Sequence, residues 1–360
     1  MQASIRNNRL ENIDIAKGIG MLLVIWAHIL VEGPINWFIY VFHMPLFFYI
    51  SGMLYTPDKY KKVGTLVSKR ARTLIVPYVI YSCITWAVWC GYAILSHQEV
   101  DSYLKPLFQT VIAQGSGGFL VHNVPLWFVT CLFVVEIAYY FINKLRDDKI
   151  KAMTCVVISG IGYCMIEVFT FFPFNLLPWS IEVACATMIY YGAGNILRSN
   201  TKCVCDKFKE SKTVIRFAMI ATLFLITTFC SLRTRHISYG SDGLGDRPIE
   251  LYVGAFTGIA LILLISALIT SFSASSNVIN GIISYVKWIG KYSFRFMAIH
   301  VPIKGFLTVV VAKMFSITTD VVGGSIGYSL IVFAITLGLS TIITILTNHG
   351  VRSLTNRKQK

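Results

Sequence analysis

Long apolar runs are the feature that most limits what this chain can fold into. They recur along all 360 residues, and each is close to the roughly 20 residues that a helix needs to cross a bilayer. Of the residues, 55% are hydrophobic and only 14% are charged. A soluble domain has about 45–50% apolar and roughly 25% charged residues. The sequence therefore predicts a polytopic membrane protein with little chain left for a soluble domain.

The apolar runs also define an expected topology. We expect an all-α integral membrane protein, a bundle of about ten transmembrane helices with both termini cytoplasmic, as one domain over residues 1–360. The predicted helices are 15–32, 36–55, 74–95, 120–142, 152–171, 178–197, 214–231, 250–271, 293–315 and 325–347. The intervening loops are alternately rich and poor in Lys and Arg, and basic residues concentrate in cytoplasmic loops. This alternation supports the helix count and orients the bundle.

The formal net charge of +15 could indicate a nucleic-acid-binding protein. The cytoplasmic loops account for that excess of basic residues, so we expect no nucleic-acid partner. Most of the nine cysteines lie inside apolar runs, where cysteine behaves as a small hydrophobic residue. Cys203 and Cys205 lie in a basic loop with no histidine nearby. We therefore expect neither a disulfide framework nor a structural metal.

The first predicted helix carries three ionisable residues, which are costly inside a bilayer and so are candidates for function. Asp14 and Lys17 are neighbours at i and i+3. His28 follows Lys17 by eleven positions, which is within about 20° of three full helical turns. One stripe thus carries a carboxylate and an ammonium at the cytoplasmic end and an imidazole about 16 Å further along. Alternatively, the pair only reaches the membrane interface and His28 lies among the outer headgroups.

His43 lies about seven residues below the outer surface on the second predicted helix. His28 is in the same outer half of the neighbouring antiparallel helix, so the two side chains can converge. Imidazole titrates near neutrality, which suits removal of a proton from a hydroxyl group. A single membrane histidine is more often a packing or hydrogen-bonding residue, but two that face each other favour chemistry.

A basic segment from Lys59 to Arg72 follows the second predicted helix. Its last basic residues, Lys69, Arg70 and Arg72, lie against the third helix on the side where Lys17 also reaches the surface. Such a cluster suits a phosphorylated ligand, because Arg can bind phosphate through two hydrogen bonds. The alternative role is topological, since the same residues hold the loop in the cytoplasm.

The first two predicted helices resemble those of the acyltransferase family 3 membrane proteins. The resemblance rests on DIAKGIGMLLVIWAH, from Asp14 to His28, and on FHMPLFFYISG, from Phe42 to Gly52. The sugar O-acetyltransferase branch, which includes fucose 4-O-acetylases, is the most similar. Lys17 and His28 match the family pattern of Arg or Lys, ten residues and then His, with the less common lysine at the first position. The Arg-x-x-Arg motif is met only loosely by Lys69-Arg70-Ala71-Arg72, which leaves open which residue carries that role.

The resemblance implies a membrane O-acyltransferase of the bacterial cytoplasmic (inner) membrane. Its donor would be an acyl-CoA, usually acetyl-CoA, as a substrate and not a permanently bound cofactor. Its acceptor would be a hydroxyl of a cell-surface polysaccharide or of a lipid-linked precursor. The CoA phosphates would lie at Lys17, Lys69, Arg70 and Arg72. His28 would be the general base or a transient acyl carrier, with His43 orienting or relaying and Asp14 on the same catalytic stripe.

Four further residues are weaker candidates for binding the acceptor: Glu32, Trp127, Arg247 and His300. Glu32, four residues after His28, could orient that imidazole or simply face the outer water. Other ionisable residues in or near the helices are candidates to pair with one another, namely Glu136, Glu167, Glu182, Arg295 and Lys304.

Two other classes of protein compete with the acyltransferase hypothesis. The first is a transporter or flippase for a glycan or small solute, with the same ionisable residues forming a proton relay. Transporters often have inverted repeats and helices broken at matching places, and the sequence reveals neither. The second is a structural or sensor subunit, which would not need the register between Lys17 and His28. The oligomeric state is open.

Overall fold

The computed structural model describes residues 2–56, 59–95, 99–115, 119–169, 177–240, 243–271 and 276–357. Side chains are described throughout these ranges except in 2–10, 168–169 and 349–357. Within them the chain forms helices and no β-strand, apart from an isolated bridge between Ser238 and Gly243. The predicted all-α class is confirmed.

The first half of the chain contains ten helical elements. They are α1 (Gln2–Ile29), α2 (Pro34–Tyr40), α3 (His43–Leu54), α4 (Val63–Arg70), the π-helix η2 (Ala71–Ile75), α5 (Val76–Leu95), α6 (Lys105–Ile112), the 3-10 helix η3 (Val124–Leu126), α7 (Trp127–Ile142) and α8 (Asp148–Phe169).

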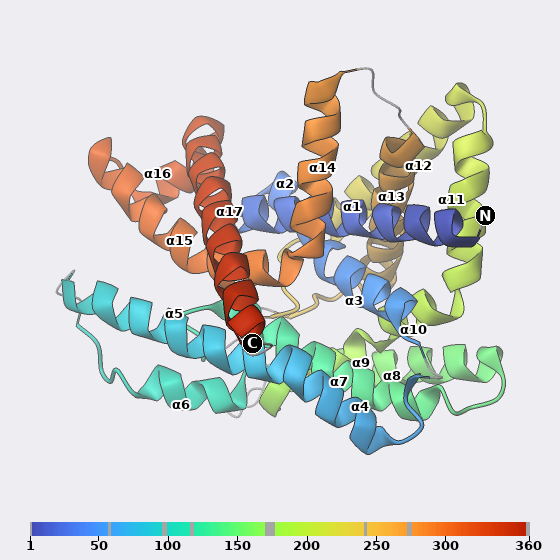
Figure 1. Cartoon of the computed structure of the whole chain (residues 1–360), viewed down its shortest axis with the longest axis horizontal. Coiled ribbons are helices and arrows are strands. Elements are labelled where there is room, and N and C mark those ends of the chain that lie inside the picture. Colours follow the sequence, from blue (N-terminus) through green and yellow to red (C-terminus); the bar gives the residue numbers. More distant parts are fainter. Residues whose placement is uncertain are drawn as a thin grey trace.

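The second half continues with the 3-10 helix η4 (Pro178–Ser180), α9 (Ile181–Ala186), α10 (Met188–Ile196), α11 (Arg198–Glu210), α12 (Thr213–Thr234), α13 (Pro248–Ser271), α14 (Asn277–Lys291), α15 (Ser293–Met314), α16 (Thr319–Gly324) and α17 (Ile326–Arg357). The first helix, α1, runs across the middle of the molecule (Figure 1). It packs against α3, α13, α14, α15 and α17, so a stripe of residues along it faces several other helices.

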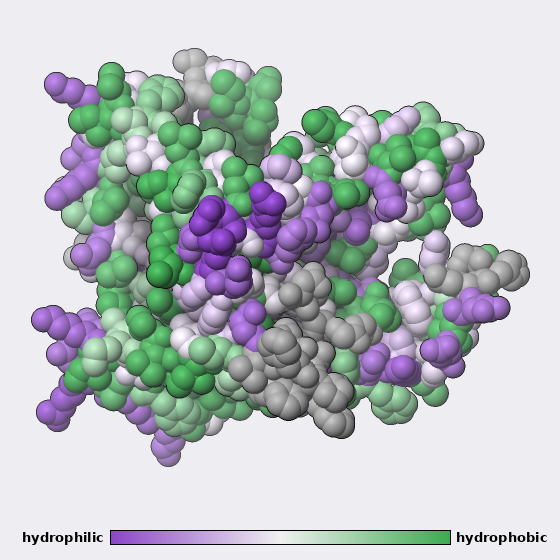
Figure 2. Space-filling model, turned by 180° about the vertical axis from the view of Figure 1, so that it is seen from behind, coloured by the Kyte–Doolittle hydropathy of each residue, from purple (hydrophilic) through white to green (hydrophobic). Residues whose placement is uncertain are grey.

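Nine helical segments in the described ranges are long and apolar enough to cross a membrane. They lie in α1, α2–α3, α4–α5, η3–α7, α8, α12, α13, α15 and α17. Apolar residues cover much of the face shown in Figure 2, around a hydrophilic patch near its centre. The chain is thus an integral membrane protein of the multi-pass type.

These nine segments correspond to nine of the ten predicted helices. The other predicted helix, 178–197, is divided between η4, α9 and α10, with the break between the last two at Thr187. The last two residues predicted for the helix at 152–171 lie outside the described part of the chain. The basic segment expected as a loop is also partly helical, because α4 continues through η2 into α5.

The second crossing is broken between α2 and α3, immediately before His43. Pro45 causes the break, because proline has no N–H and its ring clashes with the carbonyl four residues earlier, here that of Val41. The break leaves Tyr40 at the end of one helix and His43 at the start of the next. It therefore brings two polar side chains to the same point inside the bundle.

A second proline shapes α15. Pro302 lies inside this helix, so the carbonyl of Ala298 receives no helical hydrogen bond from it. The side-chain amide of Asn123 donates a 2.6 Å hydrogen bond to that carbonyl. Asn123 is completely buried and comes from the segment just before η3. A distant loop thus satisfies the carbonyl that the proline leaves free, close to His300.

Candidate functional site

A cavity of about 490 Å³ lies among α1, α3, α7 and α15. This volume is within the range of about 300–1,000 Å³ typical of small-molecule sites. Residues from α2, η2, η3 and two loops complete the wall. The lining comprises Lys17, Met21, Val24, His28, Tyr40, His43, Met44, Phe47, Ile50, Ser51, Leu54, Leu74, Gly115, Val124, Pro125, Trp127, Phe128, Leu132, Ser238, Tyr239, Gly240, Ser293, Phe294, Met297, Val301 and Lys304. It is mostly apolar, with a few polar groups that could orient a ligand.

Three helices line the cavity over equal lengths. The lining residues extend from Lys17 to His28 on α1, from His43 to Leu54 on α3 and from Ser293 to Lys304 on α15. Each stretch advances eleven residues, or about 16 Å of helix. On α1 the lining residues recur at helical spacing, so the stripe expected from the sequence faces the cavity. Lys17 and His28 therefore lie at two separated positions along one cavity.

His28 lies within a group of aromatic and polar side chains. Its Nδ1 is 3.4 Å from the hydroxyl of Tyr40. The ring of His300 is also close, with 5.3 Å between the two ring centroids. Tyr40 in turn packs edge-on against His43, at 4.8 Å between ring centroids. The structure thus brings His28 and His43 to one end of the cavity, with Tyr40 between them and His300 beside them.

Backbone carbonyls fix the proton positions on two of these imidazoles. The Nδ1 of His43 is 3.0 Å from the carbonyl oxygen of Ile39. The Nδ1 of His300 is 2.9 Å from the carbonyls of both Phe296 and Met297. A carbonyl oxygen only accepts, so Nδ1 carries the proton in both residues. In the neutral imidazole Nε2 then has the lone pair, which is the form that accepts a proton.

At the Lys17 position of the cavity the ammonium is already paired. The Nζ of Lys17 lies 2.8 Å from a carboxylate oxygen of Asp14, one turn earlier on α1. Both side chains are largely buried, with relative exposures of 19% and 25%. Lys17 lines the cavity and Asp14 does not. The structure therefore places Asp14 as the partner of Lys17, away from the imidazoles.

The other predicted basic residues do not line the cavity; their segment contributes Leu74 instead. The Nε of Arg70 forms a 2.5 Å ion pair with Glu136, whose side chain is only 3% exposed. Lys69 lies over the ring of Tyr60, at 5.8 Å from its centroid, and Arg72 is exposed. The charge of Arg70 is thus engaged within the protein, whereas Lys69 and Arg72 are accessible.

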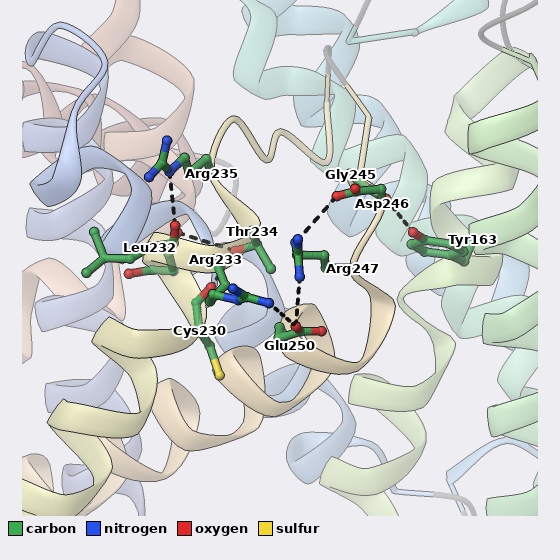
Figure 3. Close-up of polar contacts among 11 residues, drawn as sticks. Tyr163, Cys230, Leu232, Arg233, Thr234, Arg235, Gly245, Asp246, Arg247 and Glu250 are labelled. Carbon is green, nitrogen blue, oxygen red and sulfur yellow. Dashed lines mark hydrogen bonds and ion pairs between the residues drawn. The ribbon is translucent and has the colours of Figure 1, made fainter.

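Of the four weaker acceptor-binding candidates, two lie at or beside the cavity and two lie away from it. Trp127 is buried and lines the cavity, and His300 contacts His28. Glu32 is exposed and forms an ion pair with His236 on the outer loop, so it does not orient His28. Arg247 lies outside the cavity lining, and its Nη1 is 3.4 Å from Glu250 (Figure 3).

Two loops pack against the indole of Trp127. A Cβ on Gly115 would lie 2.4 Å from the carbonyl oxygen of Gly240, and a Cβ on Gly240 would lie 2.3 Å from the indole nitrogen. The neighbouring Tyr239 hydroxyl is 2.8 Å from that of Tyr190. Burial raises the pKa of Tyr239, so this hydroxyl stays neutral. These segments close the cavity beside Trp127.

Four of the five ionisable residues that were candidates to pair with one another have other partners. Glu136 pairs with Arg70, and Arg295 donates a 2.7 Å hydrogen bond to Asn348. Glu182 accepts from the backbone N–H of Leu177, and Glu167 from that of Leu244. Lys304 lines the cavity.

The sequence does not single out Tyr40, and it offers Lys304 only as one of five ionisable residues that are weak candidates for the site. The spacing of each residue from a histidine could have pointed to it. Tyr40 is three residues before His43, and Lys304 is one helical turn after His300. Neither spacing is decisive, because the break after α2 and the packing of α15 determine which way those side chains face.

An all-helical membrane protein with an internal cavity and a group of imidazoles has the framework of an intramembrane group-transfer enzyme. The chain belongs to acyltransferase family 3, whose acyltransferase domain matches residues 10–345. It is therefore a membrane acyltransferase.

Among individual proteins, the chain is similar to nodulation protein NolL of Mesorhizobium japonicum, with 37% identity over 94 residues. That match covers 23% of this chain and 25% of the relative, so it spans only a quarter of the relative's length. No solved structure matches the chain.

Proposed function

We propose that this acyltransferase moves an acetyl group from acetyl-CoA to a hydroxyl of a cell-surface polysaccharide or of its lipid-linked precursor. The observation that carries the proposal is that Lys17 and His28 line the same cavity from one face of α1, about 16 Å apart. A long donor with a phosphorylated end and a thioester end matches that arrangement. The bacterial inner membrane, where cytoplasmic CoA and outward glycans meet, is the proposed location.

The donor is proposed to bind with its phosphates at the Lys17 end. Lys17 lines the cavity there, and Lys69 and Arg72 are accessible on the cytoplasmic side of the segment that contributes Leu74. The apolar walls between Lys17 and His28 suit the pantetheine arm, which is of similar length. The thioester would then lie beside the imidazoles. Arg70 is proposed to support this region through Glu136 and not to bind phosphate.

The chemical step is proposed to be general-base catalysis by His28. Its imidazole takes the proton of the acceptor hydroxyl while the hydroxyl oxygen attacks the thioester carbonyl. The new C–O bond forms, the C–S bond breaks, and the imidazolium returns the proton to the departing thiolate. Tyr40 and His43 orient the ring of His28. A second route passes through an acetyl-imidazole on His28 and would leave label on the protein.

The acceptor is proposed to enter beside Trp127. The loops that carry Gly115 and Gly240 line the cavity there and pack against Trp127. With the donor extending from Lys17, an entry beside Trp127 is proposed to let the acceptor approach the imidazoles from another side. A sugar is a fitting acceptor class, since it presents several hydroxyls and an apolar ring face to an aromatic side chain.

Radiolabelled acetyl-CoA supplied to the purified protein in lipid nanodiscs tests the proposal. The wild type should release CoA or acquire label, and His28→Ala should do neither while still binding CoA. His236→Ala is the matched control, because that histidine is exposed on the outer loop and should leave the rate unchanged. Full activity of His28→Ala would exclude His28 as the base. A wild type that binds no CoA would favour the transporter hypothesis, which the breaks at 41–42 and 187 also suit.

A further inference from the structure

Lys304 is a cation that no residue in the described part of the chain neutralises. It lines the cavity and is half-buried, yet it forms no ion pair with the described residues. Two basic side chains that are also largely buried differ, since Lys17 pairs with Asp14 and Arg70 pairs with Glu136. A charge within a membrane protein is costly without a partner, so an unpaired ammonium facing a cavity indicates an anion that is present only during function.

The position of Lys304 identifies which end of the cavity this charge serves. Lys304 is one helical turn after His300 on α15, and such i and i+4 residues share a face. The ring of His300 lies against that of His28, at 5.3 Å between centroids. Lys304 is also close enough to both imidazoles to interact with them electrostatically. The free ammonium therefore belongs to the imidazole end, where the thioester is proposed to react.

Acyl transfer creates a negative charge at this place. When the acceptor oxygen attacks, the carbonyl π electrons move onto the carbonyl oxygen, and a tetrahedral oxyanion forms. A charged donor that is already positioned, in a site with little water, stabilises such an oxyanion strongly. We propose that Lys304 is a catalytic residue that stabilises the oxyanion of the acetyl thioester. The inference rests on the proposed function and adds a second group to its chemistry.

The roles of His28 and Lys304 are then complementary. The acceptor proton goes to His28, and the carbonyl electrons go to an oxygen held by Lys304. When the C–S bond breaks, those electrons re-form the carbonyl π bond and the proton stays on the imidazolium until the thiolate takes it. CoA leaves as the thiol after taking the proton from the imidazolium. Lys304 gives up no proton in this cycle, so its contribution is electrostatic. An arginine at the same position should therefore retain part of the activity.

The test compares Lys304→Met, which keeps the length of the side chain but removes the charge, with Lys304→Arg, which keeps the charge. Lys313→Met is the matched control, an exposed lysine on the same helix. Acetyl-CoA consumption is measured with water as the acceptor, and with methyl glucoside and methyl glucuronoside added. CoA binding is measured in parallel, and size-exclusion profiles report folding. Lys304→Gln replaces Lys304→Met if the latter aggregates.

For Lys304→Met we expect kcat to fall about 10²–10³-fold with all acceptors, while CoA binding changes less than threefold. Lys304→Arg should lie between this variant and the wild type, and Lys313→Met should equal the wild type. If Lys304→Met keeps the wild-type rate while His28→Ala is inactive, the proposed role of Lys304 is overturned, and the proposed function is not. If Lys304→Met only raises the KM for the glucuronoside, the oxyanion role is also overturned. The charge of Lys304 would then serve to bind an anionic acceptor. A wild type that neither binds CoA nor consumes acetyl-CoA would overturn the proposed function as well.

Discussion

The amide of Asn123 donates a 2.6 Å hydrogen bond to the carbonyl of Ala298, an oxygen that Pro302 leaves without its helical partner. The two residues are 175 positions apart in the chain. This contact fixes the loop before η3 to the middle of α15. Since α15 also carries His300 and Lys304, the contact links the loop beside Trp127 to the imidazole end of the cavity.

Replacing Asn123 with alanine should destabilise the protein by about 1–3 kcal/mol, because the carbonyl of Ala298 would lose the one side-chain donor that it has among the described residues. Thermal unfolding of the detergent-solubilised protein measures the change as a lower midpoint. Asn200→Ala is the control, since Asn200 is exposed and should leave the midpoint unchanged. Equal midpoints for Asn123→Ala and the wild type would show that this contact does not hold the loop.

Two glycines allow α3 and α10 to pack backbone against backbone. A Cβ on Gly52 would lie 2.0 Å from the carbonyl oxygen of Tyr191, and a Cβ on Gly194 would lie 2.0 Å from that of Tyr49. Small residues allow this close approach between membrane helices. Gly194→Ala should therefore separate the helices and lower the yield of folded protein sharply, in a size-exclusion assay.

Gly91→Ala is the matched control for this substitution. Gly91 lies inside α5, and a Cβ there meets no atom within 4 Å. Since alanine favours helix by about 1 kcal/mol over glycine, this variant should be as stable as the wild type or slightly more stable. Similar behaviour of Gly194→Ala and Gly91→Ala would exclude close packing as the reason for Gly194.

Loss of Arg70 should lower the stability of the protein, whereas loss of Arg72 should weaken CoA binding. Arg70→Ala leaves the carboxylate of Glu136 buried without its partner, at a cost of about 3–5 kcal/mol in stability. Adding Glu136→Gln should recover most of that loss. Arg72→Ala should leave stability unchanged, because the side chain is exposed, and should weaken CoA binding. Thermal unfolding and CoA titration measure the two effects. Weakened CoA binding in the stable double variant would instead assign Arg70 to the phosphates.

Tyr40→Phe should slow acetyl transfer without changing the KM for acetyl-CoA. The hydroxyl, 3.4 Å from His28, helps to orient that ring, and one hydrogen bond corresponds to a rate loss of about threefold to tenfold. Steady-state kinetics on the purified enzyme give both parameters. Tyr103→Phe, which removes an exposed hydroxyl, should match the wild type. An effect on KM alone would place Tyr40 in donor binding instead.

The stripe from Lys17 to His28 could be read from the sequence because it depends only on helical periodicity within α1. The multi-pass architecture was equally accessible, since bilayer thickness sets a length that apolar runs must reach. The division of 178–197 into short helices was not accessible, because no proline or glycine stands at Thr187 and only the surrounding packing reveals the break.

The partners of the ionisable residues depend on contacts between distant segments. Arg70 finds Glu136 on α7, and Glu32 reaches His236 on the outer loop. Local spacing suggested phosphate binding for the first and contact with His28 for the second. Each side chain contacts instead a polar side chain from a segment that lies far away in the sequence.

By itself, the sequence determined that the chain spans a membrane as helices and that Lys17 and His28 lie on one face of the first. Both follow from interactions within a single segment, between apolar side chains and lipid or between successive helical turns. The tertiary structure alone decided that His300, Tyr40 and Lys304 join His28 at one end of a cavity, and that Lys304 forms no ion pair there with any described residue. Those facts depend on the break between α2 and α3 and on how these helices and α15 pack around α1, which no single segment encodes.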